Sequence, residues 1–323
     1  MGSTDRKLRV IYGDGGLGLG GDGFHYIFSY KLGGMESLVL GGKEWLYRPP
    51  MPAFWRAVTD NDRGNGFPFR SGMWLGADLF SRCTAIAVTV DGEKIETPKA
   101  PVNNRYGEEE QASRVQVSYE YQTNTVPAAF VSVSYEVGAD GRIHVSVHYH
   151  GQKGLPQLPV FGLRFIVPDP AFGYLYDGLS GETYPDRMAG AARGIFRVEG
   201  LPVTPYLVPQ DCGVHMQTWW LEVYGERNPW NKQESREVRD IRFEAEKEPF
   251  AFSCLPYTAQ ELENATHQEE LPLKRRTVLS ILGAVRGVGG IDSWGSDVEA
   301  LYQISGEQDI RYSFAITASE DTW

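Results

Sequence analysis

The chain has 323 residues, of which 41% are hydrophobic and 12% aromatic, so it can bury a large core. Its formal net charge of −11 argues against nucleic-acid binding, and no apolar run reaches the length of a membrane span. Three widely spaced cysteines (Cys83, Cys212 and Cys254) form neither a disulfide framework nor a zinc motif. Residues 1–7 are polar and lack the apolar centre of a signal peptide, so we expect a cytoplasmic protein with reduced thiols.

Strand patterns dominate the chain. Residues 143–150, for example, read Ile-His-Val-Ser-Val-His-Tyr-His, with an apolar side chain at every second position. The predicted strands span residues 24–30, 114–121, 131–137, 143–150, 160–167, 215–224, 241–245, 250–254, 276–282 and 311–316. Helix signals are confined to residues 258–264, opened by Thr258, and to a weaker candidate at 71–80. We therefore predict an all-β fold, a large antiparallel two-sheet sandwich with very little helix, formed by residues 1–323 as a single domain.

A glycine-rich stretch at residues 13–23 contains the pattern Gly-x-Gly-x-x-Gly at Gly16, Gly18 and Gly21. A dinucleotide-binding loop with this pattern needs a helix directly after it, whose N-terminus meets the pyrophosphate. Here the next residues have a strand pattern, which argues against a nucleotide site. We expect a flexible hairpin turn.

Acidic residues are concentrated at Asp60-Asn61-Asp62, within the segment Arg56-Ala-Val-Thr-Asp60-Asn61-Asp62-Arg63-Gly64. Two carboxylates this close suggest acid/base chemistry or a cation site. An EF-hand is excluded because Ser71 stands where its glutamate would be. We favour a turn in which the Asp and Asn side chains cap backbone N–H groups and pair with Arg56 or Arg63.

Charged residues also gather in the segment Glu182-Thr-Tyr-Pro-Asp186-Arg187. A reactive cluster is one interpretation, but a buried ion-pair and hydrogen-bond network that holds two loops is favoured. On the strand at 143–150, three histidines (His144, His148 and His150) share one face. A metal site is conceivable there, but no carboxylate or cysteine partner is evident nearby in the sequence, so a hydrated sheet face is favoured.

Near the C-terminus, the stretch Arg286-Gly-Val-Gly-Gly-Ile-Asp292-Ser293-Trp294-Gly combines four glycines with one tryptophan, which indicates a folded loop. A tryptophan on such a loop offers a flat apolar face that suits a sugar ring. A tryptophan that closes a sheet edge is the alternative, and for this residue taken alone it is favoured.

Four motifs in this order resemble the C-terminal domain of the bacterial β-galactosidases of glycoside hydrolase family 2. They are the segments 56–64 and 182–187, the segment Pro205-Tyr-Leu-Val-Pro-Gln-Asp211-Cys-Gly213, and Asp292-Ser293-Trp294. The chain is most similar to the small subunit of the two-chain enzymes, in which this domain is a separate polypeptide. It departs from the family pattern at Asp211, where the family has Glu, and at His215, where it has Arg.

The resemblance implies a supersandwich fold like that of galactose mutarotase, and no catalytic residue in this chain. The catalytic carboxylates and the Mg²⁺ ligands would belong to a large catalytic subunit, so no cofactor and no metal is expected here. Trp294 would reach into the active site of the complex and stack on the β-galactoside substrate, and residues 64 to about 72 would form a mobile covering loop. The other residues expected in the active-site loops are Arg63, Gly64, Asn65, Asp292 and Ser293, and those expected in structural motifs are Asp60, Asn61, Asp62, Glu182, Asp186 and Arg187.

The expected partners are thus the large subunit and a β-galactoside, with neither nucleic acid nor membrane involved. Two other functions remain open. The first is a stand-alone carbohydrate-binding module. The second is an aldose-1-epimerase-like protein, which would use the histidines at 144, 148 and 150.

Overall fold

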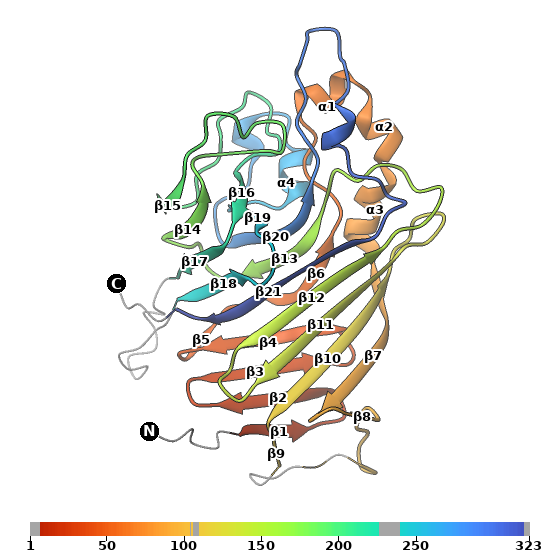
Figure 1. Cartoon of the computed structure of the whole chain (residues 1–323), viewed down its shortest axis with the longest axis vertical. Coiled ribbons are helices and arrows are strands. Elements are labelled where there is room, and N and C mark those ends of the chain that lie inside the picture. Colours follow the sequence, from red (N-terminus) through yellow and green to blue (C-terminus); the bar gives the residue numbers. More distant parts are fainter. Residues whose placement is uncertain (1–6, 104, 106–109, 226–239, 320–323) are drawn as a thin grey trace.

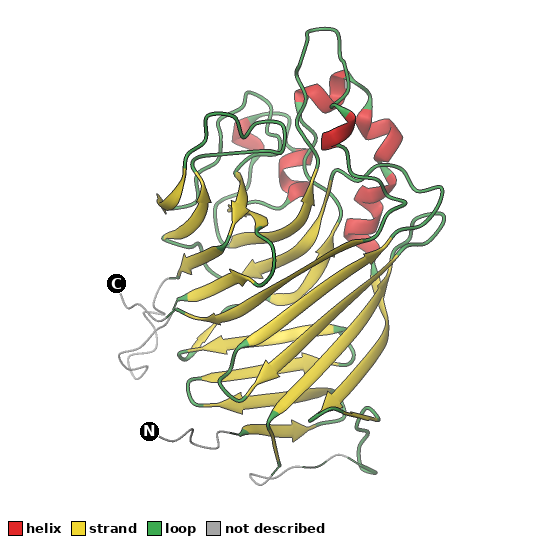
Figure 2. Cartoon of the chain, viewed as in Figure 1, coloured by secondary structure: helices red, strands yellow, loops and turns green. Residues whose placement is uncertain are grey.

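The computed structural model describes residues 7–103, 105, 110–225 and 240–319, and these residues are mostly antiparallel strands (Figure 2). The polar residues 1–6, on which the expectation about a signal peptide depends, lie outside them. In the described part, no helix combines the length and the apolar character that a membrane span requires.

The described strands form three sheets. In spatial order, the ten-stranded sheet consists of β15 (Arg193–Glu199), β14 (Gly173–Leu179), β17 (Trp220–Tyr224), β18 (Ile241–Ala245), β21 (Ile310–Ala318), β12 (Ile143–His150), β11 (Phe130–Gly138), β10 (Arg114–Gln122), β7 (Arg82–Val90) and β8 (Glu93–Ile95). The six-stranded sheet consists of β5 (Lys43–Glu44), β4 (Gly34–Leu40), β3 (Phe24–Ser29), β2 (Gly16–Gly21), β1 (Leu8–Tyr12) and β9 (Gln111–Ala112). The five-stranded sheet consists of β16 (Val214–Thr218), β19 (Phe250–Leu255), β20 (Thr277–Val285), β13 (Val160–Val167) and β6 (Arg48–Ala53).

The three sheets make two layers. Strand β4 of the six-stranded sheet lies beside β6 of the five-stranded sheet, so these two sheets together form a second layer opposite the ten-stranded one (Figure 1). Aromatic pairs join the layers at both ends: Phe28 meets Tyr135 with ring centroids 5.6 Å apart, and Phe165 meets Phe243 at 5.3 Å. Each such pair adds about 1 kcal/mol beyond area burial. The prediction of an all-β antiparallel sandwich with little helix is confirmed.

The core follows from the alternation of the sequence. In β11 every second residue is buried, and the residues between them lie on the outer, hydrated face of the ten-stranded sheet. Two core tyrosines direct their hydroxyls to backbone carbonyls across the layers, Tyr119 to Gly34 at 3.1 Å and Tyr121 to Gly33 at 2.7 Å. Burial of these phenols is therefore compatible with their need for a hydrogen-bond partner.

Every strand predicted from the sequence is present, with one divided in two. The predicted strand at 215–224 is split into β16 and β17 at Trp219. The prediction of a hairpin turn in the glycine-rich stretch is correct for Asp22-Gly23, which join β2 to β3, but wrong for residues 16–21, which form strand β2. Leu17 and Leu19 point into the core, and Gly18 lies against Ile11 of β1, where a Cβ atom would be 3.3 Å from the Ile11 Cβ.

The helices gather at one end of the sandwich, at the top of Figure 1. They are α1 (Asp60–Gly64), α2 (Phe67–Ser71), α3 (Met73–Phe80) and α4 (Ala259–Asn264), with the 3₁₀ turns η1 (Gln268–Glu270) and η2 (Ala300–Tyr302). The predicted helix at 258–264 is confirmed, since the Thr258 side chain accepts a hydrogen bond from the Glu261 N–H and Glu261 in turn accepts one from the Thr258 N–H. The weaker candidate at 71–80 corresponds to α3.

His215 is buried in the layer interface on β16. Its Nε2 lies 2.9 Å from the Tyr174 hydroxyl, and its ring stacks on Phe252 with centroids 4.8 Å apart. Burial lowers the pKa of His215 to about 4. The ring is therefore neutral in the folded chain at neutral pH, unlike an arginine at this position.

The burial of His215 predicts that the folded chain loses stability as the pH falls. Between pH 6.5 and about 4 the unfolded chain binds a proton at His215 that the folded chain does not, so stability falls as the pH falls through this window. We expect the loss in unfolding free energy between pH 7 and pH 5 to be smaller in His215→Gln than in the wild type by about 2 kcal/mol, as measured by urea unfolding. The exposed His267→Gln is the control. Equal losses in the wild type and His215→Gln would contradict this assignment.

Candidate functional site

Two segments distant in the sequence meet at the helical end of the molecule. We call residues 59–72 the apical segment and residues 286–299 the tryptophan loop. The two backbones touch where a Cβ atom at Gly295, whose φ is +79°, would lie 2.9 Å from the Gly64 carbonyl oxygen. Glycine at 295 is thus required both by its left-handed backbone and by this close approach.

The apical segment is helical, which corrects two expectations. Residues 60–64 form the helix α1 instead of a turn, and residues 67–71 of the expected covering loop form α2. That this segment moves and covers the substrate stays a prediction. The cap explains the helical form of α1: the Thr59 hydroxyl accepts from the Asp62 N–H, and the Asp62 carboxylate accepts from the Thr59 N–H, both at 3.1 Å. Asp62 does cap a backbone N–H group and pair with Arg56, as expected, and Asp60 pairs with Arg63 at 2.8 Å.

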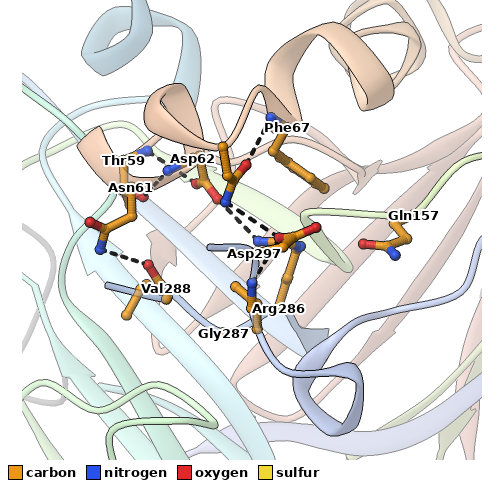
Figure 3. A network of polar contacts seen from close by, with 12 residues as sticks. Thr59, Asn61, Asp62, Phe67, Gln157, Arg286, Gly287, Val288 and Asp297 are labelled. Atoms are coloured by element: carbon orange, nitrogen blue, oxygen red, sulfur yellow. Dashed lines mark hydrogen bonds and ion pairs between the residues drawn. The ribbon is translucent and has the colours of Figure 1, made fainter. Parts of the chain in front are cut away.

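Asp62 lies between two buried arginines. Its Oδ2 is 3.2 Å from a guanidinium nitrogen of Arg56. Its Oδ1 is 3.1 Å from one of Arg286, and Figure 3 labels both Asp62 and Arg286. The side chains of all three are at most 3% exposed. Burial alone would lower the pKa of Arg56, but Asp62 and Asp211 raise it above its ordinary value, so the group stays charged.

The arginines attach the tryptophan loop to the core. Arg56 donates to the carbonyls of Arg286 and Gly287 at 3.1 and 2.9 Å. Arg286 lies 4.0 Å from the centre of the Phe67 ring and also pairs with Asp297. The start of the loop is therefore fixed by charge-assisted hydrogen bonds in a site with little water.

Asp297 connects the end of the tryptophan loop to the apical segment. Besides Arg286, it accepts a hydrogen bond from the Asn65 amide at 3.3 Å and pairs with Arg70 at 2.7 Å. From α1, the Asn61 amide donates to the Val288 carbonyl at 2.9 Å (Figure 3). Both ends of the loop are thus held by the apical segment.

Asp186 holds the loop from the other side. Its carboxylate accepts from the backbone N–H groups of Val288 and Gly289 at 3.0 and 2.8 Å, and Arg187 donates to the Gly289 carbonyl. Glu182 instead accepts from the Thr204 hydroxyl and the Gly213 N–H, at 2.7 and 2.8 Å. The expected network between loops exists, but Glu182 and Arg187 are exposed, so the expectation of a buried cluster holds for Asp186 alone.

Asp211 remains part of the site although the family pattern has Glu there. It accepts from the Tyr184 hydroxyl at 2.8 Å and lies 3.9 Å from Arg56. Burial raises the pKa of Asp211 to about 6. His215 makes its hydrogen bond to Tyr174, so it does not replace an arginine ion pair.

Trp294 stands out from this framework with its side chain 92% exposed. Its backbone is nevertheless fixed, because Asp292 accepts from the N–H groups of Trp294 and Ser296, at 2.9 and 3.2 Å, and from the Ser296 hydroxyl. These hydrogen bonds lower the pKa of Asp292, so it is a carboxylate at neutral pH. Ser293 is exposed beside Trp294. The arrangement presents a flat aromatic face to solvent on a backbone of defined shape.

Four of these residues were not identified from the sequence: Arg56 and Arg286 as loop anchors, Asp297 as the partner of Arg286, and Arg70 as a second partner of Asp297. A local signal existed for Arg56, since a single charge within Phe54-Trp55-Arg56-Ala57-Val58 indicates a buried, paired arginine. The partners of Arg286 lie up to 224 residues away, so no local pattern reveals them.

The three histidines of β12 lie on the outer face of the ten-stranded sheet. In contrast to the expectation that no carboxylate is nearby, His144 pairs with Glu246, and His148 lies 2.7 Å from Asp309. The face is hydrated, as predicted, because His144 and Asp309 are both exposed.

Comparison with known proteins gives consistent results. Residues 20–316 match the family described as β-galactosidase small chain. The chain is 60% identical to the β-galactosidase small subunit of Latilactobacillus sakei, with 98% of this chain and 100% of that protein covered. It is also 34% identical to a β-galactosidase of Halalkalibacterium halodurans and 33% identical to one of Bifidobacterium adolescentis, but it spans only 28% and 26% of their lengths.

Among solved structures, a galactose mutarotase-like protein from Lactobacillus casei aligns with a TM-score of 0.44 and 8% identity, over 94% of this chain and 100% of that one.

The arrangement of the site predicts that Asp62 contributes much more to the stability of the folded chain than Asp60, the other acidic residue of α1. Asp62→Asn leaves two buried guanidinium groups without their shared counterion, and we expect it to lower the free energy of unfolding by about 3–5 kcal/mol. Asp60→Asn is the matched control, because its side chain is 71% exposed and its pair with Arg63 contributes at most about 1 kcal/mol. Urea unfolding measures both. Similar losses would show that the buried network does not hold this end together.

Proposed function

The chain belongs to the family of β-galactosidase small chains, and from this we propose that it is the non-catalytic but required small subunit of a two-chain β-galactosidase that hydrolyses lactose. Its partner would be a large catalytic subunit, and its substrate a terminal β-galactoside. We propose a cytoplasmic location and a single domain of residues 1–323.

The share of each relative that this chain covers supports the proposal. The chain covers all of the small subunit of L. sakei but about a quarter of the single-chain β-galactosidases. A retaining glycosidase needs two carboxyl groups on opposite sides of the glycosidic bond. We propose that the large subunit supplies them, together with the Mg²⁺ ligands, as the family resemblance implies.

Three carboxylates in and around the tryptophan loop support a non-catalytic role. Asp62 neutralises buried arginines, Asp297 bridges Arg286 and Arg70, and Asp292 accepts three hydrogen bonds within its own loop. Each carboxylate is thus engaged in holding the loop. A general acid or nucleophile must instead face a bound substrate.

The observation that carries the proposal is the exposed Trp294 on a fixed backbone. We propose that this ring forms part of the active-site wall and stacks on the sugar or on its aglycone. Phe69 on α2 and Phe80 on α3 are exposed aromatics as well. We propose that this end of the molecule faces the large subunit.

Complementation tests the proposal directly. A chromogenic β-galactoside is given to this chain, to the large subunit and to their mixture. We expect activity only in the mixture. Activity of this chain alone would place catalytic carboxylates in it and contradict the proposal. Saturable sugar binding without activity in the mixture would favour a binding module, and faster α-galactose mutarotation would favour an epimerase.

The role of Trp294 is tested in the reconstituted enzyme. We expect Trp294→Ala to raise KM about fivefold, since an aromatic contact contributes about 1 kcal/mol, and to shift the balance between hydrolysis and sugar transfer. Trp294→Tyr should restore most of the loss. Tyr47→Ala removes another exposed aromatic, between β5 and β6, and is the control. Complex formation is verified for each variant by size-exclusion chromatography, and unchanged kinetics in a complete Trp294→Ala complex would exclude the stacking role.

A further inference from the structure

A second cluster of chemically capable side chains lies on the outer face of the ten-stranded sheet, away from the tryptophan loop. His148 and His150 are two residues apart on β12, and Asp309 directly precedes β21. One ligand atom from each of these residues can be chosen so that all three lie within 4.8 Å of one another. Two ligand atoms on opposite sides of a Zn²⁺ ion are separated by twice the Zn–N bond length of about 2.0–2.1 Å, which is slightly less than this limit. Small rotations of the imidazole rings therefore bring the three ligand atoms onto one ion.

The carboxylate is already oriented for this purpose. Asp309 Oδ1 accepts a hydrogen bond from the Gly151 N–H at 3.0 Å, which leaves Oδ2 facing the His148 Nε2 at 2.7 Å. The proton between these two atoms occupies the position that a cation would take. A backbone hydrogen bond to the non-coordinating oxygen is the type of outer contact that fixes metal ligands.

The two imidazoles are close enough to act together. Their ring centroids are 3.8 Å apart, and the His150 Nε2 lies 2.9 Å from the Ser132 hydroxyl on β11.

Two further charges face the cluster with opposite effects. Glu120 on β10 lies across from Ser132 and adds a negative charge. Arg311 lies across from His148 on β21, with a guanidinium nitrogen 3.2 Å from Asp309 Oδ2. This arginine competes with a cation for the same oxygen, but its side chain is 70% exposed and free to turn into solvent.

We propose that His148, His150 and Asp309 form a surface site for a divalent transition-metal ion such as Zn²⁺, with water completing the coordination. Imidazole nitrogens together with one carboxylate suit Zn²⁺, Cu²⁺ or Ni²⁺ better than Mg²⁺ or Ca²⁺. The bound ion joins the end of β12 to the turn that precedes β21, and it stabilises the folded chain by selective binding. This site revises the expectation that the chain contains no metal ligands.

Calorimetric titration of the full chain, without a histidine tag, with Zn²⁺ tests the site. We expect one saturable site per chain in the wild type. His148→Ala and Asp309→Asn should each raise Kd by about tenfold or more, as the loss of even an outer-shell partner does. His144→Ala is the matched control, because this histidine shares the strand, the face and a carboxylate partner, Glu246, but lacks a neighbouring imidazole. Arg311→Gln should have the opposite effect and lower Kd.

Thermal unfolding gives a second readout. Zn²⁺ should raise the Tm of the wild type and of His144→Ala, and EDTA should reverse the shift. The rise should be absent in the double variant His148→Ala/His150→Ala. Wild-type binding no tighter than that of the double variant, or an equal loss of binding in His144→Ala, would overturn the proposal.

Discussion

Two guanidinium groups are buried beneath the tryptophan loop, and the helical end of the sandwich depends on their neutralisation. Arg56 comes from the segment after β6, and Arg286 directly follows β20; both strands pair with β13. Each of these strands therefore leads into a buried guanidinium group. The carboxylate of Asp62 lies between them, and the cap of α1 holds that carboxylate in place. The short helices and the loop are therefore consequences of one electrostatic requirement, since a buried charge must be paired.

The pairing of these buried charges also explains why the tryptophan loop keeps a defined backbone around Trp294 with little regular secondary structure. The loop has no sheet partner, yet its backbone is held by Asp186, by Asn61 and by hydrogen bonds within its own Asp292 turn. Its order thus comes from polar contacts to backbone groups rather than from packing of the tryptophan ring. The ring consequently remains available for another molecule, while the backbone that carries it resists displacement.

The sequence predicts the sandwich better than the site, for physical reasons. Alternating strands such as β10, β11 and β12 are encoded locally and were predicted. Several other strands, among them β1, β7, β14 and β15, were not predicted. Strand β2 was missed because its glycines were interpreted as a flexible turn, although Leu17 and Leu19 alternate as a strand requires. Helix α1 was interpreted as a turn because five residues carry little propensity signal. Trp294 was found through ordered motifs, whereas Arg286, Asp297 and the pairing of His148 with Asp309 depend on contacts across the fold.

The exposure of Trp294 has a consequence for the chain as a whole. An indole that is 92% exposed leaves apolar area in water, and Phe69 on α2 is exposed to a similar degree. Single exposed apolar residues are ordinary, but here they lie at the one end of the molecule where an internal ion network fixes the backbone. Rigidity beneath an exposed aromatic lowers the ordering entropy lost on binding, which is useful only when something binds there. The same contacts that stabilise the isolated chain therefore leave this end rigid enough to receive the partner and the sugar that we propose for it.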